Sequence, residues 1–254
     1  MSLSVRSRRV IACACITGSL ACLILAATSP GVTAAAVVSI AGALLYLHST
    51  GGAVAHMSRA DRQAWQSART LGDLGALTAR WLEGTVASVP GYCGRPDEET
   101  EALILVLARL NRAGFVTTGS QPGEFFGDGD LGRQRAAVEG FASWVVAAAI
   151  ETAAVHADLI AVVHDPATLP RWRYYGRQAV TVTKIGSRDF TGFGVQVPRR
   201  HIRDTHLSYG ICGREAVDAL CGAWQVTVID PVWGRPDVLW RVLGEAVSVA
   251  GGAR

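Results

Sequence analysis

Polar and ionisable side chains stand directly after three short apolar runs that the sequence predicts to be strands. In an open α/β sheet, ligands bind beyond the carboxyl ends of parallel strands. If the three strands are parallel, these groups meet at one edge, where they can act as acids and bases or hold a divalent cation. They are Thr118, Ser120 and Gln121 after the first run, His164 and Asp165 after the second, and Asp230 after the third.

Simpler interpretations of the same residues stay open. Asp165 and Asp230 each precede a proline, and an Asp-Pro pair can merely turn the chain after a strand. Ser120 lacks the G-x-S-x-G context of a hydrolase nucleophile, because Thr118 occupies the first glycine position. The cysteines and histidines show no spacing typical of a metal site, and the sequence identifies no cofactor.

The two signs of charge are concentrated in different stretches of the chain. Residues 97–130 hold seven acids and two arginines, whereas residues 171–203 hold eight bases and one acid. A basic stretch with interleaved aromatics suits phosphate, single-stranded nucleic acid or an anionic membrane surface. It equally suits a solvated hairpin whose arginines pair with the acidic stretch. This basic patch comprises Arg171, Arg173, Arg177, Arg199, Arg200 and Arg203.

Helical and strand patterns alternate over residues 57–254, and these elements must position the polar residues. Two helix-start patterns, Ser58 to Asp61 and Thr70 to Asp73, open the region. We therefore predict an α/β domain with a mixed sheet and flanking helices. The expected helices also cover 96–114, 133–154, 214–223 and 237–247, and the expected strands cover 115–118, 159–163, 179–185, 191–197 and 225–229.

The first 56 residues have a different character from the rest. Residues 10–58 contain no Asp, Glu, Lys or Arg, and two apolar stretches, about 10–27 and 32–48, flank a short turn. The first would span roughly 27 Å as a helix, just enough for a bilayer core. Arginines lie on both outer flanks, which predicts that both ends are cytoplasmic.

These observations predict a two-helix transmembrane hairpin over residues 1–56 and a cytoplasmic domain over residues 57–254. The protein would then be a multi-pass protein of the cell membrane, with the lipid bilayer as a partner. The alternative is a signal peptide, because residues 32–34 form an acceptable cleavage site.

Composition excludes several classes of protein. The chain has 24 basic and 21 acidic residues, and 18% of its residues are charged. From residue 57 onward the two signs balance at 21 each. Disordered, collagen-like and disulfide-scaffold proteins are ruled out. A nucleic-acid partner is disfavoured, because the region as a whole lacks a basic excess.

Five stretches resemble an actinobacterial family described only as a domain of unknown function. The resemblance covers roughly residues 60–243 and is poor over 145–180. The stretches are TLGDLGALTARWLEG (70–84), PDEET (96–100), LNRAGFVTTGSQPG (110–123), QRAAVEGF (134–141) and VTVIDPVWGRPDVLWRVL (226–243).

The resemblance implies that TTGSQPG and QRAAVEGF belong to one unit. Thr118, Ser120 and Gln121 would lie on its loop, and Gln134 and Arg135 on the helix that follows. Arg135 and the first amides of that helix could then hold an anion.

Three functions remain open at this point. The first is a membrane-tethered binding or regulatory module that recognises a small anionic ligand or a protein partner. The second is an enzyme, a hydrolase or transferase acting on a phosphorylated or nucleotide substrate. The third is a structural protein associated with the membrane. The enzyme hypothesis requires Asp165 and Asp230 to line one pocket.

Overall fold

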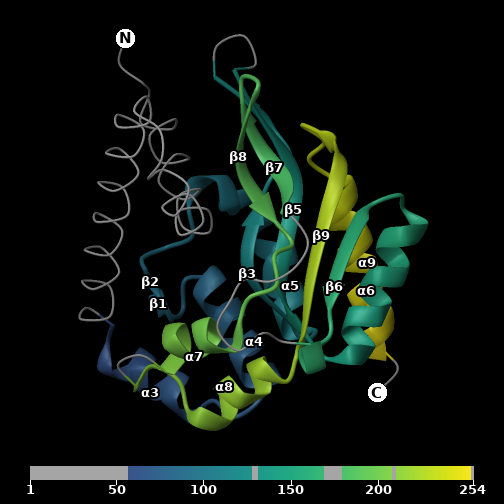
Figure 1. Cartoon of the computed structure of the whole chain (residues 1–254). Coiled ribbons are helices and arrows are strands. Elements are labelled where there is room, and N and C mark those ends of the chain that lie inside the picture. Colours follow the sequence, from purple (N-terminus) through teal and green to yellow (C-terminus); the bar gives the residue numbers. More distant parts are fainter. Residues whose placement is uncertain (1–56, 128–130, 169–178, 208–209, 253–254) are drawn as a thin grey trace, which may run out of the picture.

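The chain is organised around one seven-stranded sheet in which every described strand pair is antiparallel. The computed structural model describes residues 57–127, 131–168, 179–207 and 210–252 (Figure 1). The strand order is β6-β9-β5-β7-β8, with β3 and β4 also paired to β5. These strands are β3 (Phe115–Gln121), β4 (Phe125–Phe126), β5 (Gly132–Ala142), β6 (Ile160–His164), β7 (Val180–Ile185), β8 (Arg188–Phe193) and β9 (Trp224–Trp233).

Helices cover both faces of the sheet. On one face, α5, α6 and α9 pack against alternate residues of β5 and β9, including Ala136, Val138 and Val228. On the other face, α3, α4 and α8 pack around Phe141 at the lower end. The helices are α3 (Arg59–Ser67), α4 (Leu71–Leu82), η2 (Glu98–Leu103), α5 (Ile104–Arg112), α6 (Trp144–His156), η3 (Pro166–Thr168), α7 (Arg199–Leu207), α8 (Arg214–Cys221) and α9 (Val238–Gly252); a separate two-stranded sheet joins β1 (Ser88–Val89) to β2 (Tyr92–Cys93).

Both helix-start patterns in the sequence are confirmed. The Ser58 hydroxyl accepts a hydrogen bond from the Asp61 amide at 3.0 Å and caps α3. At α4, the Thr70 hydroxyl accepts from the Asp73 amide at 3.1 Å, while the Asp73 carboxylate accepts from the Thr70 amide at 2.9 Å. This reciprocal capping satisfies amides that a helix N-terminus leaves unpaired.

The predicted helix over 133–154 is wrong in its first half. Residues 132–142 form β5, and the helix begins only after Ser143, whose hydroxyl accepts from the Val146 amide. Alanines favour a helix in isolation, but here Ala136 and Ala137 are fully buried on the two opposite faces of the sheet, each in a separate apolar cluster. A Cβ at Gly140 would collide with the Val116 carbonyl of the neighbouring strand. Tertiary packing therefore overrides local propensity.

The predicted fold class needs two corrections. First, the sheet is antiparallel rather than mixed: β5 and β6 do run parallel across α6, but β9 lies between them and pairs with both. Second, none of the helices in the described part of the chain is long and apolar enough to cross a membrane. The transmembrane hairpin is therefore not seen, and the segment predicted to form it, residues 1–56, lies outside the described residues.

Candidate functional site

The polar residues expected at one edge lie at two opposite ends of the sheet. Strands β3 and β9 run in one direction and β6 in the other. Asp230 follows Ile229, which pairs with Ile160 at the start of β6, whereas Asp165 follows the end of β6. Five residues of strand, roughly 16 Å, separate the two carboxylates. They do not share a site, and no group of acids, histidines and cysteines among the described residues could hold a metal ion.

His164 and Asp165 act as local structural residues at the lower end of β6. The His164 Nε2 lies 2.9 Å from the Gly194 carbonyl oxygen. The Asp165 carboxylate accepts from the Ala167 amide at 2.7 Å. Asp165 therefore closes the turn into η3, as the simpler interpretation of an Asp-Pro pair expected.

Asp230 is a structural carboxylate at the upper end of β9. It has no exposed surface. Its oxygens accept from Arg235 Nε and Nη2 at 2.7 and 2.8 Å and from the Val232 amide at 2.8 Å. A carboxylate whose acceptor sites are filled by a guanidinium is held as an ion pair and is not a free acid or base.

The three residues expected on a loop after 118 belong to β3 instead. The Gln121 amide donates to the Arg135 and Val182 carbonyls at 3.0 and 2.9 Å, at the point where β7 replaces β3 beside β5. Thr118 is exposed and donates to the Glu139 carbonyl at 3.3 Å. Ser120 is half-buried in the strand. Gln121 thus has a clear structural role in joining the two strands.

Gln134 and Arg135 lie on β5, so the helix N-terminus expected beside them does not exist. The structure offers a different cationic arrangement here. The Arg135 guanidinium carbon lies 4.2 Å from the ring centroid of Trp233, and that of Arg133 lies 5.2 Å from the same ring. We call Arg133, Arg135 and Trp233 the arginine–tryptophan cluster.

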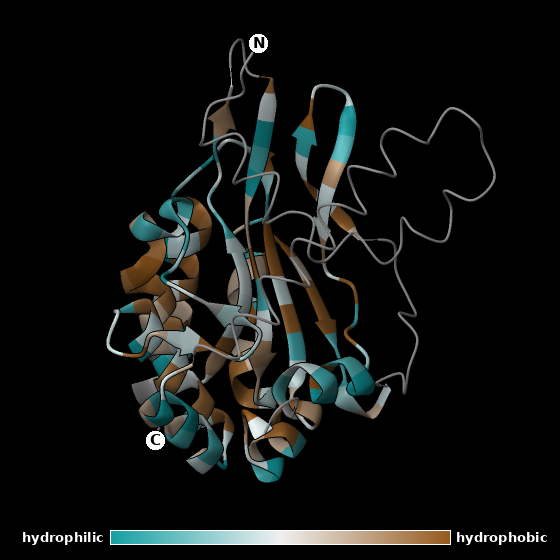
Figure 2. Ribbon diagram, turned by 90° about the vertical axis from the view of Figure 1, so that its left-hand side faces the viewer, coloured by the Kyte–Doolittle hydropathy of each residue, from teal (hydrophilic) through white to brown (hydrophobic). Residues whose placement is uncertain are grey.

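The β-sheet geometry itself builds this cluster. Arg133 and Arg135 are two positions apart on β5, so both side chains lie on the same face. Trp233 is the cross-strand partner of Arg135 on β9, at a bulge in the pairing of the two strands. Figure 2 shows that this upper end of the sheet is hydrophilic, whereas the lower parts of the strands are hydrophobic.

The two guanidinium groups have few partners of their own. Arg135 donates to the Thr181 carbonyl at 3.0 Å. Within the described residues neither arginine forms an ion pair, and the Nε of each is buried without an acceptor. Burial lowers the pKa of Arg135; Asp230 opposes this shift, and the charge of Arg133 adds to it. Two like charges held together without a carboxylate between them attract an anion.

Glu139 is an ionisable group that the sequence reasoning missed. It lies on the same face of β5 as the cluster, below Ala137, with Gly119 and Phe193 close by. Among the described residues its carboxylate accepts a single long hydrogen bond, from the Gly194 amide at 3.5 Å. Burial therefore raises the pKa of Glu139 to about 7. The alternation of a strand would have identified it, had residues 134–141 not been interpreted as helix.

Glu99 is a second such group, on the opposite side of β5. Burial raises its pKa to about 7, helped by the charges of Asp97 and Glu124 and opposed by a hydrogen bond with Gln134. One oxygen of Glu99 and the amide oxygen of Gln134 are buried without a partner among the described residues. The polar contacts of Gln134 therefore belong to this acidic side and not to the arginine–tryptophan cluster.

The described half of the predicted basic patch is engaged in local contacts. On α7, Arg200 pairs with Asp204 at 3.4 Å, and Arg203 pairs with Asp218 of α8 at 2.8 Å. Arg199 donates to the Cys221 carbonyl at 3.5 Å. In this described half, the paired acids come from α7 itself and from the neighbouring α8 rather than from the acidic stretch. The predicted members Arg171, Arg173 and Arg177 lie outside the described residues.

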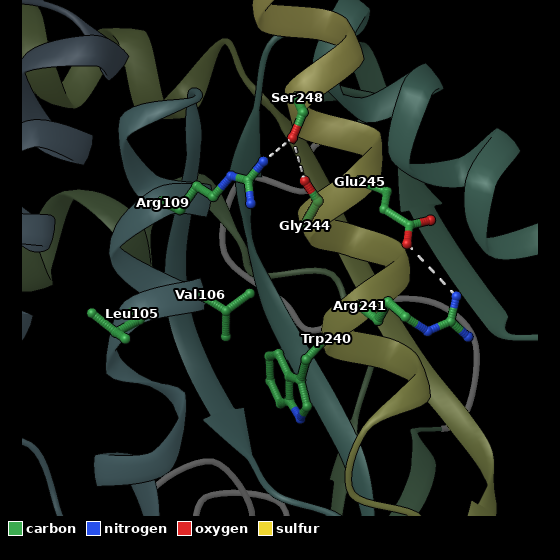
Figure 3. Close-up of a pocket in the computed structure, with 8 residues that line it drawn as sticks. All are labelled: Leu105, Val106, Arg109, Trp240, Arg241, Gly244, Glu245 and Ser248. Carbon is green, nitrogen blue, oxygen red and sulfur yellow. Dashed lines mark hydrogen bonds and ion pairs between the residues drawn. The ribbon is translucent and has the colours of Figure 1, made fainter.

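A groove between α5 and α9 offers no catalytic arrangement. Figure 3 shows Arg109 directed at Ser248 across the groove and Arg241 directed at Glu245 along α9. The one carboxylate is thus paired, and the serine hydroxyl itself donates to the Gly244 carbonyl at 2.6 Å. The lining residues are Leu105, Val106, Arg109, Trp240, Arg241, Gly244, Glu245 and Ser248.

The fold and its surface define an α/β domain that carries an aromatic-backed cationic site at one end of an antiparallel sheet. The chain belongs to the family described as a domain of unknown function (DUF6919), whose family model matches residues 60–250. The expected membership of an uncharacterised domain family is thereby confirmed. No curated protein matches the chain.

Proposed function

We propose that this domain is a binding module for a small anionic ligand that carries phosphate or carboxylate groups. The site is the arginine–tryptophan cluster. One observation carries the proposal: two guanidinium groups lie against one indole ring, and within the described residues neither forms an ion pair, the charge of Asp230 acting on Arg135 only from a distance.

The chemistry of the cluster favours an oxyanion. A guanidinium presents a planar fork of donors that matches carboxylate and phosphate geometry. The indole holds the cations by its negative face, and this limits their side-chain freedom before a ligand arrives. Because Arg135 covers one face of the ring at 4.2 Å, that face is not available to stack on a base, so the site suits a small anion better than single-stranded nucleic acid.

An enzyme acting on a phosphorylated substrate is the second candidate, and Glu139 is the observation that favours it. A carboxyl group with a pKa of about 7 suits general acid–base catalysis. Glu139 is, however, four residues from Arg135 along β5, and the buried side chains of Ala137, Val182 and Phe193 fill the space on that face. An anion held by the arginines would not reach the carboxyl group, so binding is the better-supported function.

The test measures binding of pyrophosphate, inorganic phosphate and citrate to the full-length chain by titration calorimetry and thermal shift. Ligand binding to the folded state raises the melting temperature by mass action. We expect saturable binding that Arg135→Met weakens at least tenfold, with a smaller loss for Arg133→Met. Arg188→Met, at an exposed arginine of β8, is the matched control. Binding that survives Arg135→Met, or a folded chain that ignores all three anions, would overturn the proposal.

A further inference from the structure

Helix α6 has an apolar outer face. Its exposed residues include Trp144, Val145 and Val155, which are 54%, 67% and 63% exposed. The helix contains a single acid, Glu151, and no lysine or arginine. A helix on the surface of a globular domain normally directs charged and polar residues outward, so this face is unusual for a surface in permanent contact with water.

Strand β6, which follows α6, is an edge of the sheet that no other described strand covers. It ends the strand order, and in the described sheet it pairs only with β9, in regular register over five residues. Its sequence IAVVH has no charge-bearing Lys, Arg, Asp or Glu and no proline. Exposed edge strands are normally blocked by such residues or by bulges.

The opposite edge of the sheet shows this protection. Strand β8 carries Arg188 and Asp189, and its pairing with β7 contains two register shifts. Charges and irregular pairing prevent another strand from adding there. The absence of both devices at β6 is therefore a property of that edge and not of the whole sheet.

The two unprotected features lie together. Figure 1 shows α6 beside β6 at the same end of the sheet, and α6 leads directly into β6. The helix is roughly 20 Å long and the strand roughly 17 Å. They form one continuous strip, which we call the α6–β6 edge.

We infer that the α6–β6 edge binds a second copy of this chain. A two-fold axis beside β6, level with the middle of the strand, places two β6 strands antiparallel, which continues the only pairing that the described sheet uses. The same rotation brings the two α6 helices against each other. Ala148, Ala149 and Thr152 on α6 are small, so the helix axes can approach to about 8–10 Å.

The low charge of the α6–β6 edge favours a second copy of this chain as its binding partner. Glu151 and His156 are the only ionisable residues of α6, so each copy brings a single acid and a single histidine to the interface. A strip with a single acid also has no means of selecting a strongly charged partner. A strip of roughly 20 Å by 20 Å is small beside the about 800 Å² per partner of standard interfaces. We therefore expect a reversible dimer with a dissociation constant on the order of micromolar.

Site-directed cross-linking of the full-length chain tests this interface. Thr152→Cys places a thiol on the outer face of α6, close to its copy across the proposed axis. After mild oxidation we expect a disulfide-linked dimer on a non-reducing gel, at least fivefold above the parent chain with its six native cysteines. Ser187→Cys, at the exposed β7–β8 turn, is the matched control and should give only the parent background.

A second set of variants tests whether charges introduced on α6 abolish the cross-link. Val145→Glu and Val155→Glu, added to Thr152→Cys, should reduce the cross-link to background, whereas Leu105→Glu, at a residue of α5 that is 84% exposed, should leave it unchanged. A chain with Val155→Lys mixed with one carrying Val145→Glu, each also with Thr152→Cys, should regain it, because position 155 of one helix faces position 145 of the other across the axis. No cross-link above the Ser187→Cys control, or a cross-link insensitive to the α6 charges, would overturn the inference.

Discussion

Two carboxylates on neighbouring central strands have opposite surroundings. Asp230 on β9 has no exposed surface, and Arg235 donates two hydrogen bonds to it at 2.7 and 2.8 Å. Glu139 on β5 accepts only one, from the Gly194 amide at 3.5 Å. A guanidinium compensates the first charge, whereas no cation contacts the second within the described residues. Burial accordingly raises the pKa of Glu139 to about 7.

The comparison shows that a partner, rather than burial alone, decides the role of an interior carboxylate. With a guanidinium beside it, the carboxylate is held in an ion pair that is part of the structure. Without one, burial favours the neutral form, and the group exchanges a proton near neutral pH. The aspartate that the sequence suggested for chemistry is thus the structural one, and the titrating glutamate escaped notice.

The largest expected effect comes from removing the partner of Asp230. Arg235→Ala leaves a fully buried carboxylate with only the Val232 amide as a donor. We expect the free energy of unfolding at pH 7.5 to fall by about 4 kcal/mol. Denaturant unfolding followed by tryptophan fluorescence measures this loss.

The control is an exposed ion pair on α9. Arg241 and Glu245 are 3.7 Å apart, and their side chains are 61% and 68% exposed. Arg241→Ala should cost less than about 1 kcal/mol. If Arg235→Ala lowers the free energy of unfolding no more than Arg241→Ala does, the buried ion pair of Asp230 contributes no more to stability than an exposed one.

The second effect is on the pH dependence of stability. Glu139 has a pKa of about 7 in the folded protein and about 4.3 in an unfolded chain. Between these values the folded state keeps a proton that the unfolded state has lost. The contribution of this group to stability is therefore complete below about pH 4.3, is lost as the pH rises to 7 and is constant above.

Glu139→Gln removes this titration. Above pH 7 we expect the variant to be more stable than the parent by up to roughly 3 kcal/mol, and below pH 4.5 we expect the two to be nearly equal. Unfolding free energies measured from pH 4 to pH 8 test it. Glu245→Gln, at an exposed residue of α9, controls for the change in net charge. A parent and a Glu139→Gln variant with parallel pH curves would contradict the assignment.

Local signals in the sequence predicted much of the fold. The caps at Ser58 and Thr70, the apolar run that became β6 and the hairpin around Gly186 all depend on a few neighbouring residues, and all are confirmed. The identity of β5 depends instead on partners far away in sequence. Its alanines and glycine fit between β3 and β9, and no local pattern reveals those neighbours.

The candidate site was predictable only in part. The sequence pointed to Arg135 as a residue that binds an anion, but it placed Arg135 at the start of a helix, whereas the structure has strand β5 there. Arg133 and Trp233 were not predicted to take part. Once β5 is known, strand alternation places Arg133, Arg135 and Glu139 on one face. The error in one element therefore hid both the cluster and the titrating glutamate. The direction of each strand in the sheet also depends on partners that are distant in sequence. The sequence therefore did not show that Asp165 and Asp230 lie at opposite ends of the sheet.

A smaller effect is expected for Glu99, the other carboxyl group with a pKa raised to about 7. Part of this shift comes from the charges of Asp97 and Glu124, which salt screens, so at physiological ionic strength Glu99→Gln should reduce the pH dependence less than Glu139→Gln does. Its contact Gln134 and Glu139 are five positions apart on β5 and on opposite faces. The double variant should therefore be additive to within about 0.5 kcal/mol. Strong coupling in a double-mutant cycle would show that the two groups titrate together.

The smallest effect should come from an ion pair with the same geometry as Asp230–Arg235 but without its burial. Arg112 donates to both oxygens of Glu83 at 2.6 and 2.5 Å, and the arginine side chain is 48% exposed. Water can replace each partner when the other is lost, so Arg112→Ala should leave the unfolding midpoint almost unchanged, and added salt should remove any residual difference. Parallel denaturation of Arg112→Ala and Arg235→Ala, at low and high salt, separates geometry from burial. Equal losses in the two variants would show that bidentate contact alone determines the stability that an ion pair contributes.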